Sequence, residues 1–282
     1  MIKKMFLILS LIFLGACSSS EKDSEKSYDD MPTVDDTVPA ESKPAPKSKA
    51  EKQTKKANGL NPQSQNLMDA IRSGSDEAVY KASTTLLTAQ PQDTKALMAL
   101  GMYHYRRGKP QLAMYFYSRV LSLKAVSSEV YNNIGLANLA MKEQKEAIRS
   151  FRKAIEINPQ DLNAAGNLSA LYLQVKDYGK AYVILEMAMK KGTQDVRLLT
   201  NYAIASAGRG KLEQAESLYL EIFKRHQNHK EGLYNYAVFQ IEHQKKYKEG
   251  LETISKLKFL GPGENMKTHI IALENKANAG LK

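Results

Sequence analysis

Side chains that could take part in catalysis or metal binding are few in this sequence and lie far apart. Of the five histidines, only His226 and His229 are close neighbours, and the nearest carboxylates are Glu221 and Glu231. Two histidines supply only half of the ligand set of a structural zinc ion. No glycine-rich phosphate loop, nucleophilic serine motif or pair of carboxylates accompanies them. We therefore predict no enzyme, no bound metal and no cofactor, and interpret both histidines as polar residues between helices.

The one remaining reactive side chain is Cys17, the only cysteine of the chain. It follows a basic segment with Lys3 and Lys4 and an apolar run over residues 5–14 that only Ser10 interrupts. A run of about ten apolar residues is too short to cross a bilayer core, which needs about twenty. This arrangement is typical of a secretory signal, and an exported chain with one cysteine cannot form an internal disulfide.

The residues Leu14-Gly15-Ala16-Cys17 resemble the lipobox of bacterial lipoproteins. The resemblance implies that residues 1–16 are a signal peptide, removed by cleavage before Cys17. It also implies fatty acylation of Cys17, with chains such as palmitate, and two or more acyl chains hold a protein firmly in a membrane. Ser18 in place of aspartate favours, by the same resemblance, the periplasmic face of the outer membrane. The alternative is a free thiol beside an ordinary cleavage site.

Beyond the acylated cysteine, residues 17–59 have the composition of a disordered tether. They are rich in serine, lysine, proline and acidic residues, with Tyr28 as the single aromatic residue, so they cannot bury enough apolar surface to fold. Acidic residues dominate up to Glu41 and lysines dominate after it. We interpret the segment as a solvated spacer, with contact between its lysines and anionic lipid or cell wall as the alternative.

From Thr94 onward the sequence repeats with a period of 34. An apolar residue followed by a small one recurs in five rows, as in Leu100-Gly101 and Ile134-Gly135, and in four of these rows an alanine lies thirteen residues after the apolar residue. Apolar residues within a row recur at intervals of three and four, which predicts two amphipathic helices. Asn158-Pro159 ends the second helix of its row, because the residue before proline is driven out of the helical region.

This pattern resembles the tetratricopeptide repeat, which implies an all-α solenoid, a right-handed superhelix of helical hairpins. We expect six repeats and a capping helix, since the last hairpin of a solenoid otherwise exposes its apolar face. The sixth repeat has one extra residue, which we place around residues 245–247. The expected boundaries are 60–93, 94–127, 128–161, 162–195, 196–229, 230–264 and, for the cap, 265–282.

In such a solenoid the first helix of each hairpin lines a concave groove. One column of that lining is asparagine at intervals of 34, in Asn133, Asn167, Asn201 and Asn235. It resembles the asparagine ladder of O-linked N-acetylglucosamine transferase, which implies side-chain amides that bind the backbone of an extended peptide. The alternatives are that asparagine is merely common at this place, or that the groove holds a helix. Around the column we expect apolar contacts from Met98, Met102, Tyr105, Leu136, Tyr234 and Val238.

A lipobox followed by six such repeats resembles the type IV pilus pilotins and, comparably, the gliding-motility lipoproteins. This implies a membrane-anchored protein-interaction scaffold that assembles a pilus secretin or a motility apparatus. Two alternatives are an adaptor that docks peptidoglycan hydrolases and a chain that binds cell wall or another anionic polymer. The cations of residues 60–282 are spread along the chain, and no nucleic-acid-binding motif appears, so we expect no nucleic-acid partner.

Overall fold

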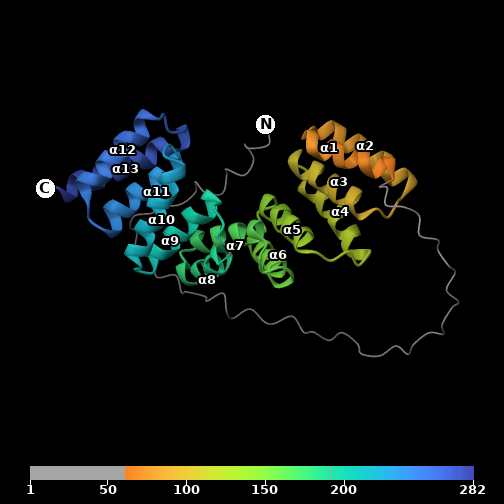
Figure 1. Ribbon diagram of the computed structural model, residues 1–282, viewed down its shortest axis with the longest axis horizontal. Coiled ribbons are helices and arrows are strands. Elements are labelled where there is room, and N and C mark those ends of the chain that lie inside the picture. The colour runs from red at the N-terminus through yellow and green to blue at the C-terminus, as the bar shows by residue number, and fades with distance from the viewer. Residues whose placement is uncertain (1–60, 191) are drawn as a thin grey trace, which may run out of the picture. The chain divides into compact units, whose positions relative to one another are not determined.

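The computed structural model describes residues 61–190 and 192–282 of the chain. Within these ranges all regular structure is helical (Figure 1). The predicted anchor at Cys17 and the tether at 17–59 lie outside the described residues. The helices are α1 (Pro62–Ser73), α2 (Asp76–Ala89), α3 (Thr94–Arg106), α4 (Pro110–Ser122), α5 (Ser128–Ala140), α6 (Gln144–Ile157), α7 (Leu162–Gln174), α8 (Tyr178–Met189), α9 (Val196–Gly208), α10 (Leu212–Arg225), α11 (Lys230–Val238), the π-helical segment η3 (Phe239–His243), α12 (Tyr247–Phe259) and α13 (Glu264–Gly280).

Each helix packs against the next one along the chain, and the first helices of neighbouring hairpins also contact one another, as α7 does with α9. The second helices carry the alanine column predicted from the repeat, and Ala113, Ala147, Ala181 and Ala215 are fully buried. Four residues further on, Tyr117, Phe151, Leu185 and Tyr219 fill the space between the paired helices. These two positions form the continuous core that the 34-residue period predicted.

From α3 to α11, the start of each first helix is fixed by a side-chain cap that also recurs at intervals of 34. Asp93, Ser127, Asp161, Asp195 and His229 each accept a hydrogen bond from a backbone N–H in the first turn of the helix that follows. Such caps satisfy donors that the helix itself leaves unpaired. His229 therefore has a structural role, because its Nδ1 accepts from the backbone N of Gly232 at 3.0 Å.

The turn inside each hairpin is tight and requires a left-handed residue. Gly74, Gly108 and Gly210 occupy this position in three repeats, with φ of 69°, 71° and 77°. Lys142, Lys176 and Lys245 occupy it in others, with φ of 65°, 59° and 59°. A side chain other than glycine is strained in this region, so three of these turns are held by the packing of the helices on either side.

The extra residue of the sixth repeat lies a few positions earlier than predicted. Gly210 and Lys245 are equivalent turn residues but are 35 positions apart, so the insertion precedes Lys245. It is absorbed in η3, where the backbone N of Gln244 donates to the carbonyl of Phe239 at 3.1 Å, five residues back. A π-helical turn accommodates one additional residue without breaking the helix.

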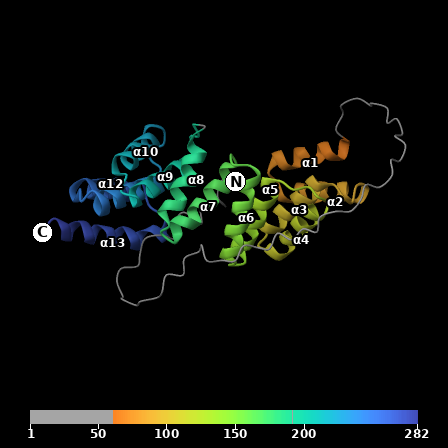
Figure 2. The ribbon, with the colours of Figure 1, turned by 90° about the horizontal axis from the view of Figure 1, so that it is seen from below.

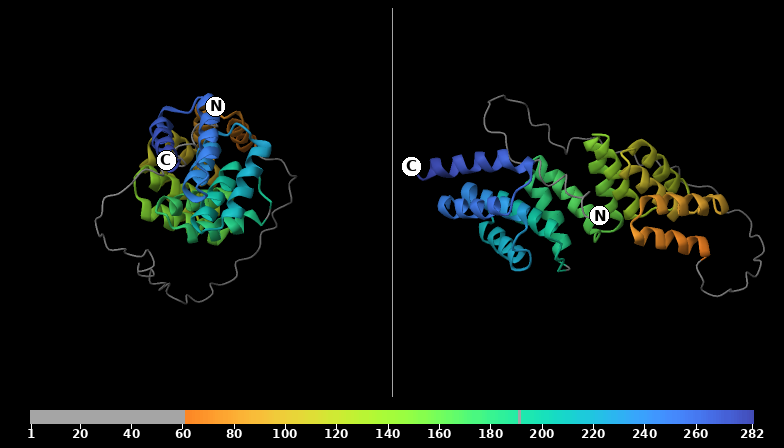
Figure 3. Two further views of the ribbon diagram at one scale, coloured as in Figure 1. Left: turned by 90° about the vertical axis from the view of Figure 1, so that its left-hand side faces the viewer. Right: turned by 90° about the horizontal axis from the view of Figure 1, so that it is seen from above.

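The last helix, α13, closes the stack. Met266, Ile270, Leu273 and Ala277 are buried in a core shared with α11 and α12. Figure 2 shows α13 running beside α12, and Figure 3 shows the same arrangement from a further side. This helix covers apolar surface that α11 and α12 would otherwise expose, which is the role expected of a cap.

Candidate protein-binding groove

The asparagine column lies on the first helices, as predicted, but its side chains are more enclosed than expected. Asn133, Asn167, Asn201 and Asn235 lie on α5, α7, α9 and α11 and are only 5–8% exposed. We expected amides open to a groove. The structure corrects this, because the neighbouring first helices lie close enough to hydrogen-bond two of these amides.

Three of the four amide groups donate within the fold. Asn167 Nδ2 donates to Asn132 Oδ1 at 2.9 Å, which links α7 to α5. Asn201 Nδ2 lies 3.3 Å from Ser169 Oγ and 3.5 Å from the carbonyl of Gly166, which links α9 to α7. The column therefore joins successive first helices to one another, and this structural role leaves fewer donors for a ligand than the sequence implied.

The other two members of the column differ in their hydrogen bonds. Asn235 Nδ2 donates to the carbonyl of Glu231 on its own helix at 2.9 Å. Asn133 Nδ2 is buried without a partner among the described residues, and its Oδ1 lies 3.4 Å from Asn132 Nδ2. The Oδ1 atoms of Asn201 and Asn235 accept no hydrogen bond from the described residues, so they retain a free acceptor.

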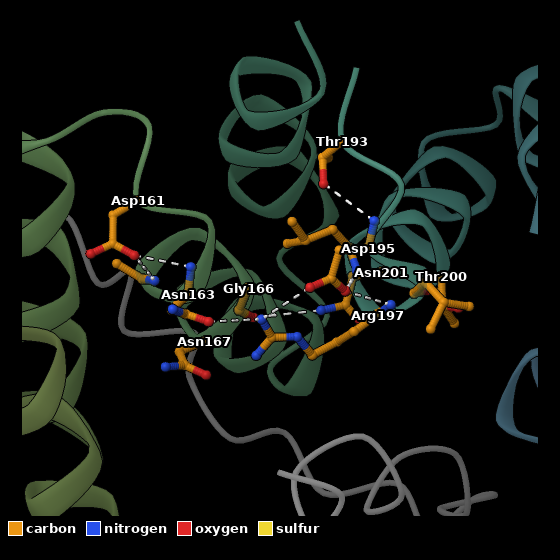
Figure 4. Close-up of polar contacts among 12 residues, drawn as sticks. Asp161, Asn163, Gly166, Asn167, Thr193, Asp195, Arg197, Thr200 and Asn201 are labelled. Carbon is orange, nitrogen blue, oxygen red and sulfur yellow. Dashed lines mark hydrogen bonds and ion pairs between the residues drawn. The ribbon is translucent and has the colours of Figure 1, made fainter. Parts of the chain in front are cut away.

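The surface near Asn167 and Asn201 also carries an arginine that bridges two repeats. Figure 4 shows the Arg197 side chain running from α9 across Gly166 of α7. A Cβ at Gly166 would lie 3.0 Å from the guanidinium carbon. The guanidinium Nη2 lies 3.5 Å from Asn163 Oδ1 and 3.7 Å from Asp195 Oδ2. The contact with Asn163 joins α9 to α7, whereas Asp195 is the cap of α9 itself.

The other predicted groove residues are either partly buried at the edge of the core or buried within it. Met98, Tyr105 and Leu136 are partly buried and pack against the core, and Met102 Sδ accepts from Arg106 Nη2 at 3.2 Å. Tyr234 was predicted to line the groove, and this is wrong. It is 8% exposed and belongs to the core that α11 shares with α12 and α13, because the capping helix covers it.

A defined pocket is present where α7, α9 and α11 meet. It has a volume of about 220 Å³. Asn201, Asn235 and Val238 of the predicted set line it, together with Ala170 and Leu173 of α7, Ile204 and Ala207 of α9, and Phe239 of η3. The repeat pattern did not indicate the polar residues at its edge, which are Gln174, Lys176, Tyr178, Glu242 and His243. The irregularity of the sixth repeat was the available signal, since Glu242 and His243 lie in η3.

The charges at the edge of this pocket are unequal. Glu242 Oε1 pairs with Lys276 Nζ of α13 at 2.6 Å, so its charge is neutralised within the fold. Desolvation lowers the pKa of His243, which favours the neutral imidazole. Burial, and secondarily the charge of Glu242, raise the pKa of Tyr178. Lys176 makes no ion pair with any described residue, so it contributes the unbalanced charge at the pocket.

Among the described residues, no three histidine, cysteine or acidic side chains gather closely enough to bind a metal ion. The described helices also include none of the length and hydrophobicity needed to cross a membrane. The pocket between α7, α9 and α11 is the candidate binding site on the ground of its lining. What it offers is apolar contact and hydrogen-bond acceptors.

Two segments of the chain match tetratricopeptide-repeat families, over residues 75–128 and 128–161. The chain is similar to Tetratricopeptide repeat protein 8 of Caenorhabditis elegans, with 29% identity over 146 residues, covering 51% of this chain and 29% of that protein. It is also similar to the BBSome complex member BBS4 homolog of Drosophila melanogaster, with 32% identity over 95 residues, 34% of this chain and 20% of that one. The chain thus spans less than a third of either relative.

Solved structures extend the likeness over most of the described helices. PilF of Pseudomonas aeruginosa has a TM-score of 0.63 at 17% identity, covering 77% of this chain and 96% of that one. A tetratricopeptide repeat protein of Parabacteroides merdae has a TM-score of 0.59 at 18% identity, covering 77% and 89%. At these identities the likeness shows the fold alone. With the repeat matches over residues 75–161, it shows an all-α fold of tetratricopeptide repeats, and repeats of this kind mediate protein–protein interaction.

Proposed function

We propose that this chain is a membrane-anchored scaffold without catalysis of its own, which binds an extended segment of a partner protein along its first helices. The observation that carries the proposal is the pocket between α7, α9 and α11. It combines apolar walls with the free acceptor atoms Asn201 Oδ1 and Asn235 Oδ1. A peptide in extended conformation offers backbone N–H groups at regular intervals, and its side chains alternate in direction, so one strand can meet both features at once.

The proposed location and the proposed machine rest on the sequence. The signal-like segment and the lipobox at Cys17 support a lipid anchor in the outer membrane, facing the periplasm. A lipobox followed by six repeats supports a role in assembling a type IV pilus secretin or a gliding-motility apparatus. PilF of Pseudomonas aeruginosa shares the fold with this chain, and this likeness concerns the fold alone.

The second candidate is binding of an anionic polymer such as cell wall. Residues 61–282 contain 31 lysine and arginine residues against 21 aspartate and glutamate residues, and this excess favours it. The cations are distributed over the helices, and many of them form ion pairs with neighbouring acidic residues, such as Arg106 with Asp76 at 3.0 Å. We therefore prefer a protein partner bound in the groove over an anionic polymer.

Affinity capture from membranes of the native host tests the proposal. The full chain carries a photocrosslinking amino acid at position 204, inside the pocket, or at position 183 as a control. Val183 is half exposed on α8, outside the residues that line the pocket. We expect secretin or motility subunits to be crosslinked from position 204 and not from position 183. Peptidoglycan hydrolases captured from position 204 would favour the adaptor function. Capture of cell wall alone, abolished by salt, would overturn the proposal in favour of polymer binding.

A further inference from the structure

The pocket between α7, α9 and α11 differs from the rest of the groove in its construction. Its last wall is η3, the π-helical turn that absorbs the extra residue of the sixth repeat. Phe239, Glu242 and His243 of this turn all reach the pocket. π-Helical turns are rare in proteins, and those that occur are often found at functional sites. The insertion therefore builds a feature that a regular repeat of 34 would not form.

The walls and the volume indicate what fits. Ala170, Ile204 and Val238 occupy equivalent places on α7, α9 and α11, at intervals of 34, and together with Leu173 and Phe239 they make the interior apolar. An apolar cavity of about 150 Å³ is large enough to bind benzene, and this pocket has about 220 Å³. One aliphatic or aromatic side chain fits such a space.

The charges indicate what lies beside that side chain. Glu242 is neutralised by Lys276 at 2.6 Å. Lys176 reaches the pocket from the end of α7 and makes no ion pair with any described residue. The unbalanced charge at the edge of the pocket is therefore positive, so a carboxylate on the bound segment is favoured there and a cation is not.

We propose that the pocket holds one large apolar side chain of the partner segment, and that an acidic residue next to it pairs with Lys176. This rests on the proposed function and specifies the chemistry of the peptide that the groove prefers. The apolar side chain is the anchor, because interface residues that fill a desolvated pocket contribute most of the binding energy. The backbone N–H groups on either side of the anchor donate to Asn201 Oδ1 and Asn235 Oδ1.

A phage-displayed library of random dodecapeptides, selected on the full chain in detergent, tests this inference. We expect enrichment of peptides in which a large apolar residue lies within two positions of aspartate or glutamate. Synthetic copies of the enriched peptides are then titrated against variants. Ile204→Arg should weaken binding about tenfold or more, as loss of a central anchor contact does. Ala170→Phe, which fills the pocket from a partly buried position, should have the same effect.

Two matched controls separate the pocket from the rest of the groove. Leu136 occupies on α5 the repeat position that Ile204 occupies on α9, and it is absent from the pocket lining. Leu136→Arg should therefore weaken peptide binding much less than Ile204→Arg does. Lys176→Glu should reverse the selected preference from acidic to basic residues. Lys142→Glu, at the equivalent turn with φ of 65°, should leave the preference as it was.

The outcomes distinguish this inference from the function on which it rests. If peptides bind the parent chain but Leu136→Arg abolishes their binding and Ile204→Arg does not, the groove binds peptide and the pocket assignment is wrong. Enriched peptides without a large apolar residue also overturn the assignment. If no peptide is enriched, peptide binding itself is contradicted. Circular dichroism of each variant confirms that it is folded before its affinity is compared.

Discussion

Gly135 in α5 leaves the space that the ring of Phe151 in α6 occupies. A Cβ at Gly135 would lie 2.5 Å from Cε1 of Phe151, and that ring is fully buried. The same relationship holds one repeat earlier, where a Cβ at Gly101 would lie 2.3 Å from Cε1 of Tyr117. The small residue that follows the apolar one in these two rows is thus required by an aromatic ring of the paired helix.

We therefore expect Gly135→Ala to destabilise the chain by about 1–3 kcal/mol, since it forces extra volume into a packed core. Gly179→Ala in α8 is the matched control, because its Cβ would meet only Asp177 Oδ1, at 3.7 Å. That change should stabilise by about 0.5–1 kcal/mol, through the higher helix propensity of alanine. Urea unfolding followed by circular dichroism measures both. Equal effects of the two substitutions would contradict the packing argument.

The strained turns give a second prediction. Lys142 is exposed and has φ of 65°. Left-handed backbone costs a lysine about 1–2 kcal/mol, and glycine loses part of that gain through its greater freedom when unfolded. Lys142→Gly should therefore raise the unfolding free energy by roughly 0.5–1 kcal/mol. Gly210→Lys, at the equivalent turn where nothing crowds a Cβ, should lower it by a similar amount. Thermal melting of both variants measures these effects. A Lys142→Gly variant that is less stable than the parent chain would contradict backbone strain at this turn.

The asparagine column predicts a difference in folding stability between two of its members. Asn167→Ala removes a buried hydrogen bond and leaves Asn132 Oδ1 without its donor, so it should cost about 1–3 kcal/mol. Asn133 Nδ2 has no partner among the described residues, so Asn133→Ala should cost clearly less. A double-mutant cycle between Asn132 and Asn167 measures the bond directly. A coupling energy near zero would show that this hydrogen bond does not stabilise the fold. Ligand binding would then remain as the role of the column.

The cap of α11 predicts sensitivity to acid. Desolvation, opposed by Glu231 and assisted by His226, lowers the pKa of His229 below its ordinary value of 6.5. The unfolded chain then binds more protons than the folded one, so the contribution of His229 is complete above pH 6.5 and is lost as the pH falls below that value. His229→Asn keeps a good cap that does not titrate.

This variant should lose less stability than the parent chain when the pH is lowered from above to below 6.5. At neutral pH, His229→Ala should cost about 0.5–2 kcal/mol, the usual cost of losing a cap. Urea unfolding of the three proteins at each pH provides the comparison. His104 and His243 also have lowered pKa values. The His229→Asn variant should therefore still lose stability in acid, but less than the parent chain does. Identical pH profiles of parent and His229→Asn would exclude the cap as a source of acid sensitivity.

The proposed anchor gives the last prediction. Cys17→Ser should abolish acylation, because the cysteine sulfur is the acceptor of diacylglycerol in lipoproteins that the Leu14–Cys17 segment resembles. We expect the parent chain, but not the variant, to be labelled by a fatty-acid analogue and to stay with outer-membrane fractions after a carbonate wash. Absence of label from both proteins, with equal partitioning, would refute the anchor.

The repeat itself determined the helical hairpins, their order and their core. Columns such as Ala113, Ala147 and Ala181 recur at intervals of 34, and burial of one face by each hairpin follows from that period alone. The caps from Asp93 to His229 recur in the same way. These caps can be predicted from the sequence, because the residue ahead of each first helix recurs at the same interval.

The tertiary structure decided which polar and apolar residues remain available to a partner. Asn167 and Asn201 have the residue type and spacing of a ligand-binding ladder, but their donors are used between neighbouring helices. Tyr234 is an aromatic residue on a first helix, but α13 covers it. Repeat spacing fixes the face of a helix on which a residue lies. It does not fix how closely the next helix approaches that face, and this distance depends on side chains far apart in the sequence.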